Sequence, residues 1–368
     1  MAQEEQKLKV SQIKSMVDAA GAGWEPAETS LSLLSDEEQE MRLGLEVRED
    51  EMRRIESLLS REEGAVSPRL STERDWRNKD GLNWVTPVKD QGACGSCVAF
   101  GTIATIECQA NIQQNKDTLD LNLSEADLFF CGAGQRCDQG WWPTYALDYA
   151  KNKGIADDKC FIYDDRNMEC SLCDDKSERF AKIGNWYETI NVNKRKEWLD
   201  EKGPMVACMA VYRDFFSYKS GVYRHVTGDL AGYHAVSCIG YSQRENCWIC
   251  KNSWGEDWGD EGFFKIAYGQ ADIDTRFAMY GVEKISGPLL KEVVEEEKEG
   301  WAEAIVADYS FVDNLKIIWA YVDGKWRYQK VSDTQLGCLS NYLIGAGSIQ
   351  VRYKDKQIVR IRGWRKIT

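Results

Sequence analysis

A cysteine that closes a tight glycine-serine turn is the feature of this chain with the clearest chemistry. Cys97 ends the run QGACGSC over residues 91–97 and begins an apolar stretch that predicts a helix over residues 97–114. A thiol at a helix N-terminus faces unpaired backbone N–H groups and the positive end of the helix dipole, and both favour the thiolate. Because the thiolate is the nucleophilic form of cysteine, Cys97 is the candidate nucleophile.

Three further side chains could complete a site for acyl transfer. His234, one of only two histidines, stands in the run GYHAV and could act as general base toward the thiol. Asn252, in the run KNSWG, could orient the imidazole ring through a hydrogen bond. Gln91 lies six residues before Cys97 and could donate its side-chain amide to an oxyanion.

Together these segments resemble the papain family of cysteine peptidases, which includes the cathepsins. His234 lies 137 residues after Cys97, and Asn252 lies 155 residues after it, close to the family spacing. The resemblance covers roughly residues 70–285, a little over half of the chain. Other segments that fit the family are DWR at 75–77, VTPVKDQ at 85–91, LSEADL at 123–128 and WGEDWG at 254–259.

The resemblance implies a cysteine endopeptidase that is made as a zymogen, acts on polypeptides and needs no cofactor or metal. His234 would take the proton of Cys97, whose sulfur would attack a peptide carbonyl to form a thioester that water then hydrolyses. Asn252 would orient the ring, and Trp254 would shield that contact from water. Gln91 and the backbone N–H of Cys97 would stabilise the oxyanion.

The resemblance also implies a specificity pocket that accepts an apolar residue two positions before the scissile bond. Its lining would be Gly140, Trp141, Cys208, Gly232 and Tyr233. No histidine-rich insertion of the kind that blocks the cleft in exopeptidase relatives is visible, which favours an endopeptidase.

Two positions depart from the family pattern. Val98 follows the nucleophile where the family usually has tryptophan, and Gln139 precedes Gly140 where the family usually has a second glycine. Neither side chain acts in the chemistry, so we expect altered packing near the cleft with activity retained.

Thirteen cysteines leave at least one thiol unpaired in a monomer. The resemblance implies a Cys94–Cys137 bridge, with Cys131 paired to Cys170 or Cys173 and the remaining one available to Cys160. Such bridges indicate an oxidising compartment, although the N-terminus lacks a signal-peptide pattern and is also compatible with a cytoplasmic protein or a removed leader.

Other interpretations of the cysteines and of the second histidine are weaker. Cys94 and Cys97 could form a structural Cys-x-x-Cys pair, and Cys170, Cys173, Cys247 and Cys250 could bind zinc. The zinc site is disfavoured because consecutive side chains of a strand point to opposite faces. We interpret His225 as an ordinary surface histidine.

The predicted fold class is α+β, a two-lobed papain-like fold with additions at both ends. We expect helices first and strands from about residue 186, with Glu107 and Glu125 as structural carboxylates. The predicted divisions are a helical, propeptide-like segment at 1–68, a catalytic domain at 69–288, an acidic linker at 289–300 and a small all-β domain at 301–368.

Charge and hydropathy exclude some functions. The net charge of −13 argues against a nucleic-acid binder, and no apolar run is long enough to span a membrane. We expect a monomer whose own N-terminal segment acts as an inhibitor. The alternatives are a catalytically silent binding module that acts through its basic β domain, and a peptide ligase that uses the same acyl-enzyme.

Overall fold

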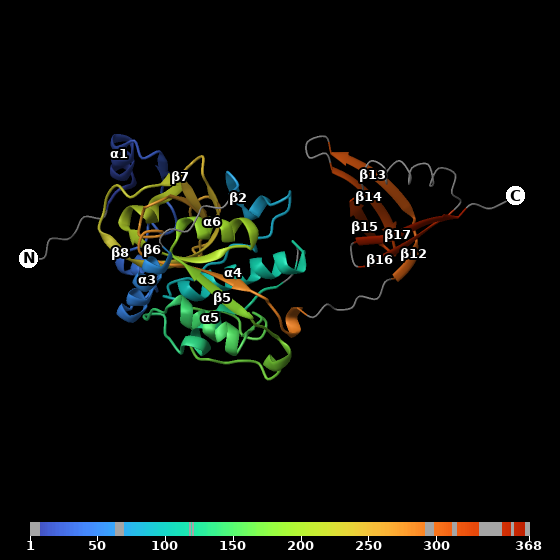
Figure 1. Ribbon diagram of the computed structural model, residues 1–368, viewed down its shortest axis with the longest axis horizontal. Helices are drawn as coiled ribbons and strands as arrows, with labels where there is room; N and C mark the ends of the chain where they lie inside the picture. The colour runs from blue at the N-terminus through green and yellow to red at the C-terminus, as the bar shows by residue number, and fades with distance from the viewer. Residues whose placement is uncertain are drawn as a thin grey trace, which may run out of the picture. The chain divides into compact units, whose positions relative to one another are not determined.

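The computed structural model (Figure 1) describes residues 8–62, 70–117, 119, 121–290, 298–310, 315–330, 348–354 and 357–364. The chain forms two compact units, Met1–Lys291 and Glu292–Thr368. The expected α+β class is confirmed by the mixture of helices and a large sheet in the first unit.

The N-terminal segment of the first unit contains three helices and one short strand. They are α1 (Val10–Ala20), β1 (Trp24–Pro26), α2 (Asp36–Glu40) and α3 (Glu49–Glu62). A capping box begins α2, because the Ser35 and Glu38 side chains each bond the other's backbone N–H. Ile13 and Val17 of α1 are buried, whereas Met16 on the same helix is 45% exposed.

The helical part of the first unit is built around α4 (Cys97–Gln114), whose bounds match the expected helix. It is buried on nearly every side rather than along one stripe, because helices, loops and the sheet all pack against it. The other elements here are η1 (Trp76–Asn78), η2 (Asp127–Ala133), α5 (Pro143–Asn152), η3 (Lys176–Glu178) and the β3–β4 pair (Ile155–Ala156 and Phe180–Ala181).

Strands dominate the second half of the first unit. The sheet order is β1-β7-β10-β9-β8-β6-β11-β5, with β2 (Glu73–Asp75) paired to β8. The other bounds are β5 (Asn185–Thr189), α6 (Val192–Glu201), β6 (Met205–Tyr212), η4 (Arg213–Ser217), β7 (Tyr218–Tyr223), β8 (Leu230–Ser242), β9 (Cys247–Lys251), β10 (Phe263–Ala267), β11 (Met279–Glu283) and η5 (Pro288–Leu290).

Helix α4 approaches β8 closely enough to bring residues from the two halves of this unit together. A Cβ atom on Gly101 would lie 3.1 Å from the backbone of Val236, so the helix touches the strand through a bare glycine. Cys97 therefore begins the helix one turn from the contact, and His234 lies two residues before it on the strand.

The second unit is a six-stranded sheet in the order β12-β16-β17-β15-β14-β13. An Asp323-Gly324 hairpin joins β14 to β15, and both residues have positive φ, as a tight hairpin turn requires. The strands are β12 (Lys298–Trp301), β13 (Ala304–Ser310), β14 (Leu315–Val322), β15 (Lys325–Lys330), β16 (Ser348–Lys354) and β17 (Gln357–Trp364).

Ile318, Ala320 and Val322 of β14 are all buried, and Ala320 and Val322 share a small core with Val351, Tyr353 and Ile358. Among the described residues of both units, no helix combines the length and apolar character needed to cross a bilayer.

Candidate active site

The Cys97 thiol is fully buried at the first residue of α4. Burial raises its pKa to about 11, although the backbone N–H groups of Ala235, Gly44 and Val98 act on the sulfur in the opposite direction. The thiol is therefore neutral at pH 7 in this state. Ala235 follows His234 directly, so the sulfur lies beside the strand that carries the candidate base.

The imidazole of His234 projects from β8 and is also fully buried. Its Nε2 lies 2.8 Å from Oδ1 of Asn252, which follows β9. Burial lowers the pKa of His234 to about 4, against the opposing effects of Asn252 and the Arg42 carbonyl. The other ring nitrogen, Nδ1, has no hydrogen bond of normal geometry within the described part of the chain. Nδ1 is thus the ring nitrogen that does not face Asn252.

Trp254 covers the contact between His234 and Asn252. Its ring centroid lies 4.7 Å from that of the imidazole, and its side chain is 1% exposed. Phe215, Phe216 and Trp258 surround it. The hydrogen bond is thus held in an apolar surrounding, where it is electrostatically stronger than in water.

Gln91 is fully buried, and its side-chain amide has a fixed orientation. Its Oε1 accepts a hydrogen bond of 2.7 Å from the Ser253 hydroxyl. Its Nε2 therefore points the other way and donates to the carbonyls of Cys94 (2.7 Å) and Arg42 (3.0 Å). The amide hydrogens of Gln91 are thus directed to two backbone carbonyl oxygens, one of them in the N-terminal segment.

The N-terminal segment crosses the site at residues 42–46. Trp141 donates its backbone N–H to the Gly44 carbonyl (2.8 Å) and accepts from the N–H of Glu46 (3.1 Å), while Leu45 donates to the carbonyl of Tyr233 (3.2 Å). A Cβ atom on Gly44 would lie 1.7 Å from the carbonyl oxygen of Gly95, two residues before Cys97. Only glycine fits at this crossing.

The residues expected in the specificity pocket are all near this crossing segment. A Cβ atom on Gly140 would lie 2.8 Å from the Gly44 carbonyl oxygen, and Trp141 and Tyr233 make the backbone contacts just described. Cys208 is fully buried opposite Ala235 in the β6–β8 register. Gly232 differs from the others, because it faces the side chain of Leu43.

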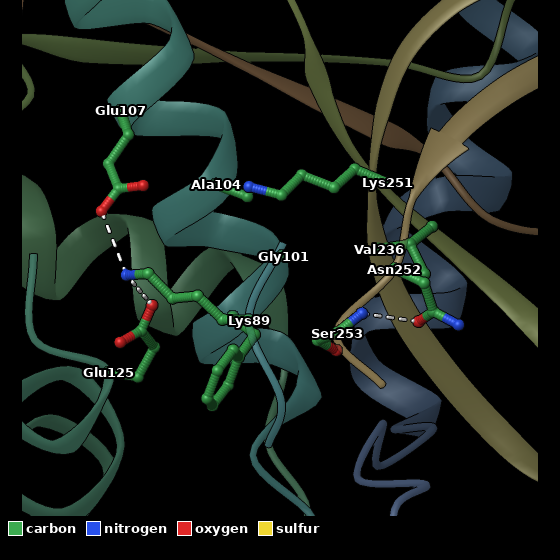
Figure 2. A pocket seen from close by; sticks show the side chains of 10 residues that line it. Lys89, Gly101, Ala104, Glu107, Glu125, Val236, Lys251, Asn252 and Ser253 are labelled. Atoms are coloured by element: carbon green, nitrogen blue, oxygen red, sulfur yellow. Dashed lines mark hydrogen bonds and ion pairs between the residues drawn. The ribbon is translucent and has the colours of Figure 1, made fainter. Parts of the chain in front are cut away.

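A charged cluster lies behind the site, around a small internal cavity with room for about one water molecule (Figure 2). Lys89 Nζ bridges Glu107 (3.3 Å) and Glu125 (2.6 Å), and these carboxylates are almost fully buried. Glu107 also accepts from the Thr86 hydroxyl at 2.7 Å. Burial lowers the pKa of Lys251, on the same cavity, to about 8.

We expect the Glu107→Ala substitution to destabilise the first unit by about 3–5 kcal/mol, because Lys89 would lose a buried partner. Urea unfolding followed by tryptophan fluorescence measures the change. Glu245→Ala, which removes the exposed partner of Lys265, is the matched control and should cost less than about 1 kcal/mol. Equal losses from the two variants would contradict a structural role for the Glu107 carboxylate.

Three disulfides stabilise the helical part: Cys94–Cys137, Cys131–Cys170 and Cys160–Cys173. Cys97 is free. The alternative zinc site is therefore wrong, because Cys170 and Cys173 are each in a disulfide. The alternative Cys94–Cys97 pair is also wrong, because Cys94 is bridged to Cys137.

His225 is partly exposed, as expected of a surface residue, but its ring is held by specific partners. Its ring stacks on Tyr212 with centroids 3.8 Å apart, and its Nδ1 lies 3.2 Å from Oδ1 of the fully buried Asp214. The ring is held in the loop after β7, outside the site, and only 29% of the side chain is exposed.

Comparisons with known proteins agree with this geometry. Residues 70–284 match the sequence profile of the papain family cysteine proteases, and the chain belongs to that family. Pro-cathepsin H of Mus musculus is 35% identical over 216 residues, which cover 53% of this chain and 60% of the mouse protein. Cathepsin B-like cysteine proteinase 2 of Haemonchus contortus is 32% identical over 222 residues, covering 50% and 65%. The chain thus spans three-fifths to two-thirds of the length of these relatives.

Solved structures of precursor forms share the fold. Procathepsin L2 from the larval midgut of Tenebrio molitor superposes with a TM-score of 0.61 at 25% identity, over 75% of this chain and 89% of that one. ProCathepsin B S9 from Trypanosoma congolense gives 0.59 at 24% identity, over 75% and 98%. The expected two-lobed papain-like fold is therefore confirmed.

Some residues at the site were not identified from the sequence. Gly44 and Arg42 carry no chemical signature, and only the pair of leucines around Gly44 in a charged segment marks it. Ser253 and Tyr163 are common polar residues whose contacts with Gln91 depend on long-range folding.

Proposed function

We propose that this chain is the zymogen of a cysteine endopeptidase that hydrolyses peptide bonds through a Cys97 thioester. The observation that carries the proposal is the convergence of a thiol at a helix N-terminus, an imidazole bonded to Asn252, and an oriented Gln91 amide around one short stretch of backbone. That backbone is the chain's own residues 42–46, which lie where a polypeptide substrate would lie.

In the active form, His234 accepts the Cys97 proton at Nδ1, since Nε2 faces Asn252. The sulfur attacks the peptide carbonyl, and the resulting oxyanion is stabilised by the Gln91 amide and the Cys97 N–H. One such donor is typically worth about 3–4 kcal/mol of barrier. The imidazolium then protonates the leaving amine, and water attacks the thioester with His234 as base.

Leu45 supports the proposed preference for an apolar residue two positions before the scissile bond. Its side chain is 5% exposed and shares a buried cluster with Trp141 and Cys208. Its backbone bonds the Tyr233 carbonyl, so the leucine is held at the pocket we expect to read the substrate. Fluorogenic peptides with leucine or aspartate at that position test this, and equal kcat/KM for both contradicts it.

The peptidase proposal is tested by labelling the acid-activated protein with a thiol-specific epoxide coupled to a peptide. We expect one label, on Cys97, and none on the Cys97→Ala variant. A silent binding module would take no label at this residue. Adding an amine nucleophile during turnover separates hydrolysis from ligation, because a ligase would give mainly the amide product.

We expect the Gly44→Ala substitution to weaken autoinhibition strongly, because the added methyl group collides with the Gly95 backbone. Activity of the full-length protein at pH 7 should rise about 10-fold or more. The matched control is Gly21→Ala, in the same segment, where no atom lies within 4 Å and only the left-handed φ is strained. If the two variants have the same basal activity, the crossing at Gly44 does not inhibit.

The remaining parts of the chain have proposed roles. Residues 1–68 act as the inhibitory segment, and activation cleaves within 64–70, a stretch that lies mostly outside the described residues. Mass spectrometry of the N-terminus after incubation tests this.

The β domain at 301–368 carries 11 Lys and Arg against 6 Asp and Glu and binds anionic protein substrates. If deletion of residues 290–368 leaves the rates on peptides and on proteins unchanged, the domain does not bind substrate.

A further inference from the structure

The Tyr163 hydroxyl lies between the two ends of the loop that carries the candidate oxyanion hole, residues 91–96. It donates a hydrogen bond to the Gln91 carbonyl at 2.8 Å and lies 2.7 Å from the Ser96 hydroxyl. A phenol has one proton to donate, so Ser96 must be the donor in the second contact. One hydroxyl therefore ties the residue that bears the oxyanion amide to the residue before Cys97.

The ring of Tyr163 is fixed by aromatic neighbours. It meets Phe100 of α4 edge to face, with centroids 4.9 Å apart, and stacks on Phe130 at 5.7 Å. Burial raises the pKa of Tyr163, so the hydroxyl keeps its proton and remains a donor at physiological pH.

The segment that carries Tyr163 is itself fastened at several points to the helical part. Asp165 Oδ2 accepts the backbone N–H of Ala93, in the middle of the same loop, at 2.9 Å. The carbonyl of Phe161 accepts from the Ser124 hydroxyl, and Cys160 is in a disulfide. Tyr163 and Asp165, which lie in one segment, thus hold the loop at its start, middle and end.

We propose that Tyr163 is a positioning residue for the oxyanion hole, acting through Gln91 and not on the substrate itself. The inference rests on the proposed function, since it assigns a role within that reaction. A displacement of catalytic groups by about 1 Å can cost about 100-fold in rate. Loss of the Tyr163 hydroxyl should therefore lower the rate of catalysis more than it weakens substrate binding.

The test is Tyr163→Phe in the acid-activated enzyme, a change that keeps the ring and removes the hydroxyl. We expect kcat for peptide hydrolysis to fall about 10-fold with KM within twofold of wild type. Alkylation of Cys97 by iodoacetamide passes through no oxyanion, so its rate should stay within twofold. In a Gln91→Ala background, Tyr163→Phe should have less than a twofold further effect, because both changes then remove the same contribution.

Tyr149→Phe is the matched control, because Tyr149 also donates one hydrogen bond, to Asp127 at 2.8 Å, and lies outside the site. It should leave kcat within twofold. An unchanged kcat in Tyr163→Phe, an equal fall in alkylation and hydrolysis, or full additivity with Gln91→Ala overturns the proposal. Failure of the proposed function is separate, since wild-type protein would then show no turnover and no label on Cys97.

Discussion

Replacing Cys97 by alanine is expected to reduce kcat for peptide hydrolysis by a factor of about 10⁵–10⁶, the loss seen when the nucleophile of a catalytic triad is removed. The proposed thioester forms on this sulfur, so alanine leaves the reaction without its nucleophile. The rate is measured with a fluorogenic peptide on protein whose N-terminal segment has been removed by added protease, since the variant cannot process itself.

Cys108→Ala is the control for this substitution. Cys108 lies on the same helix, is equally buried and is also a free thiol, but its neighbours are Ile239 and Ile249 of the sheet. Its loss should change kcat less than about threefold. Residual activity above 1% in Cys97→Ala would mean that another residue is the nucleophile.

Removal of the N-terminal segment is expected to raise the alkylation rate of Cys97 at pH 7 by about 10³-fold or more. In the closed state the thiol pKa of about 11 leaves only a trace of thiolate, and the sulfur is fully buried. Once residues 42–46 leave, water enters, the imidazole charges more easily and a thiolate–imidazolium pair forms. Stopped-flow or quenched alkylation with iodoacetamide measures both rates. Rates within tenfold of each other would show that the segment does not cover the nucleophile.

The same closed state is expected to weaken as the pH falls. The pKa of His234 is lowered to about 4, so its contribution to closure is complete above the ordinary value of about 6.5 and is lost as the pH falls from there toward 4. If opening restores the ordinary pKa, the change is about 3 kcal/mol in favour of the open state. The alkylation rate of full-length protein should therefore rise relative to that of the activated form as the solution is acidified below pH 6.5.

Glu62 contributes a second acid-sensitive contact at the end of α3. Its carboxylate accepts from the Thr189 hydroxyl and the Asn191 N–H and pairs with Lys194 at 3.0 Å. Burial raises the pKa of Glu62, but these partners outweigh it and the net pKa is lowered. The contribution of this contact is therefore complete at pH values above the ordinary pKa of a carboxyl group, and it is lost as the pH falls through the lowered pKa of Glu62. Glu62→Gln should speed opening at pH 7, and no change in alkylation rate would contradict it.

The helix and the strands that carry the candidate site could be predicted from the sequence because they depend on local patterns. Helix α4 begins at the cysteine that follows the Gly-Ser turn, and its bounds follow from its apolar run. The strands over 205–212 and 247–251 are continuous apolar segments of the length that buried strands have.

What could not be predicted depends on contacts between distant parts of the chain. Whether Cys131 pairs with Cys170 or Cys173 is decided by how a long loop folds, and spacing left both open. The contacts that hold the His225 ring involve Asp214 and Tyr212, eleven and thirteen residues away, and a lone histidine carries no sign of them. The crossing at Gly44 is set by a backbone fit, which residue type alone does not report.

The pairing of β1 with β7 has a consequence for the protein after maturation. While the N-terminal segment is in place, residues 24–26 (β1) form the edge strand of the sheet, and Trp24 is buried. Removal of the N-terminal segment would expose unpaired backbone amides and carbonyls of β7. An exposed sheet edge of this kind can pair with another copy of the protein and lead to aggregation. The exposed edge strand is only six residues long and contains Lys219 and Gly221, which make it a poor template for pairing with another strand. If the N-terminal segment is removed, these two features of β7 limit pairing between copies of the protein.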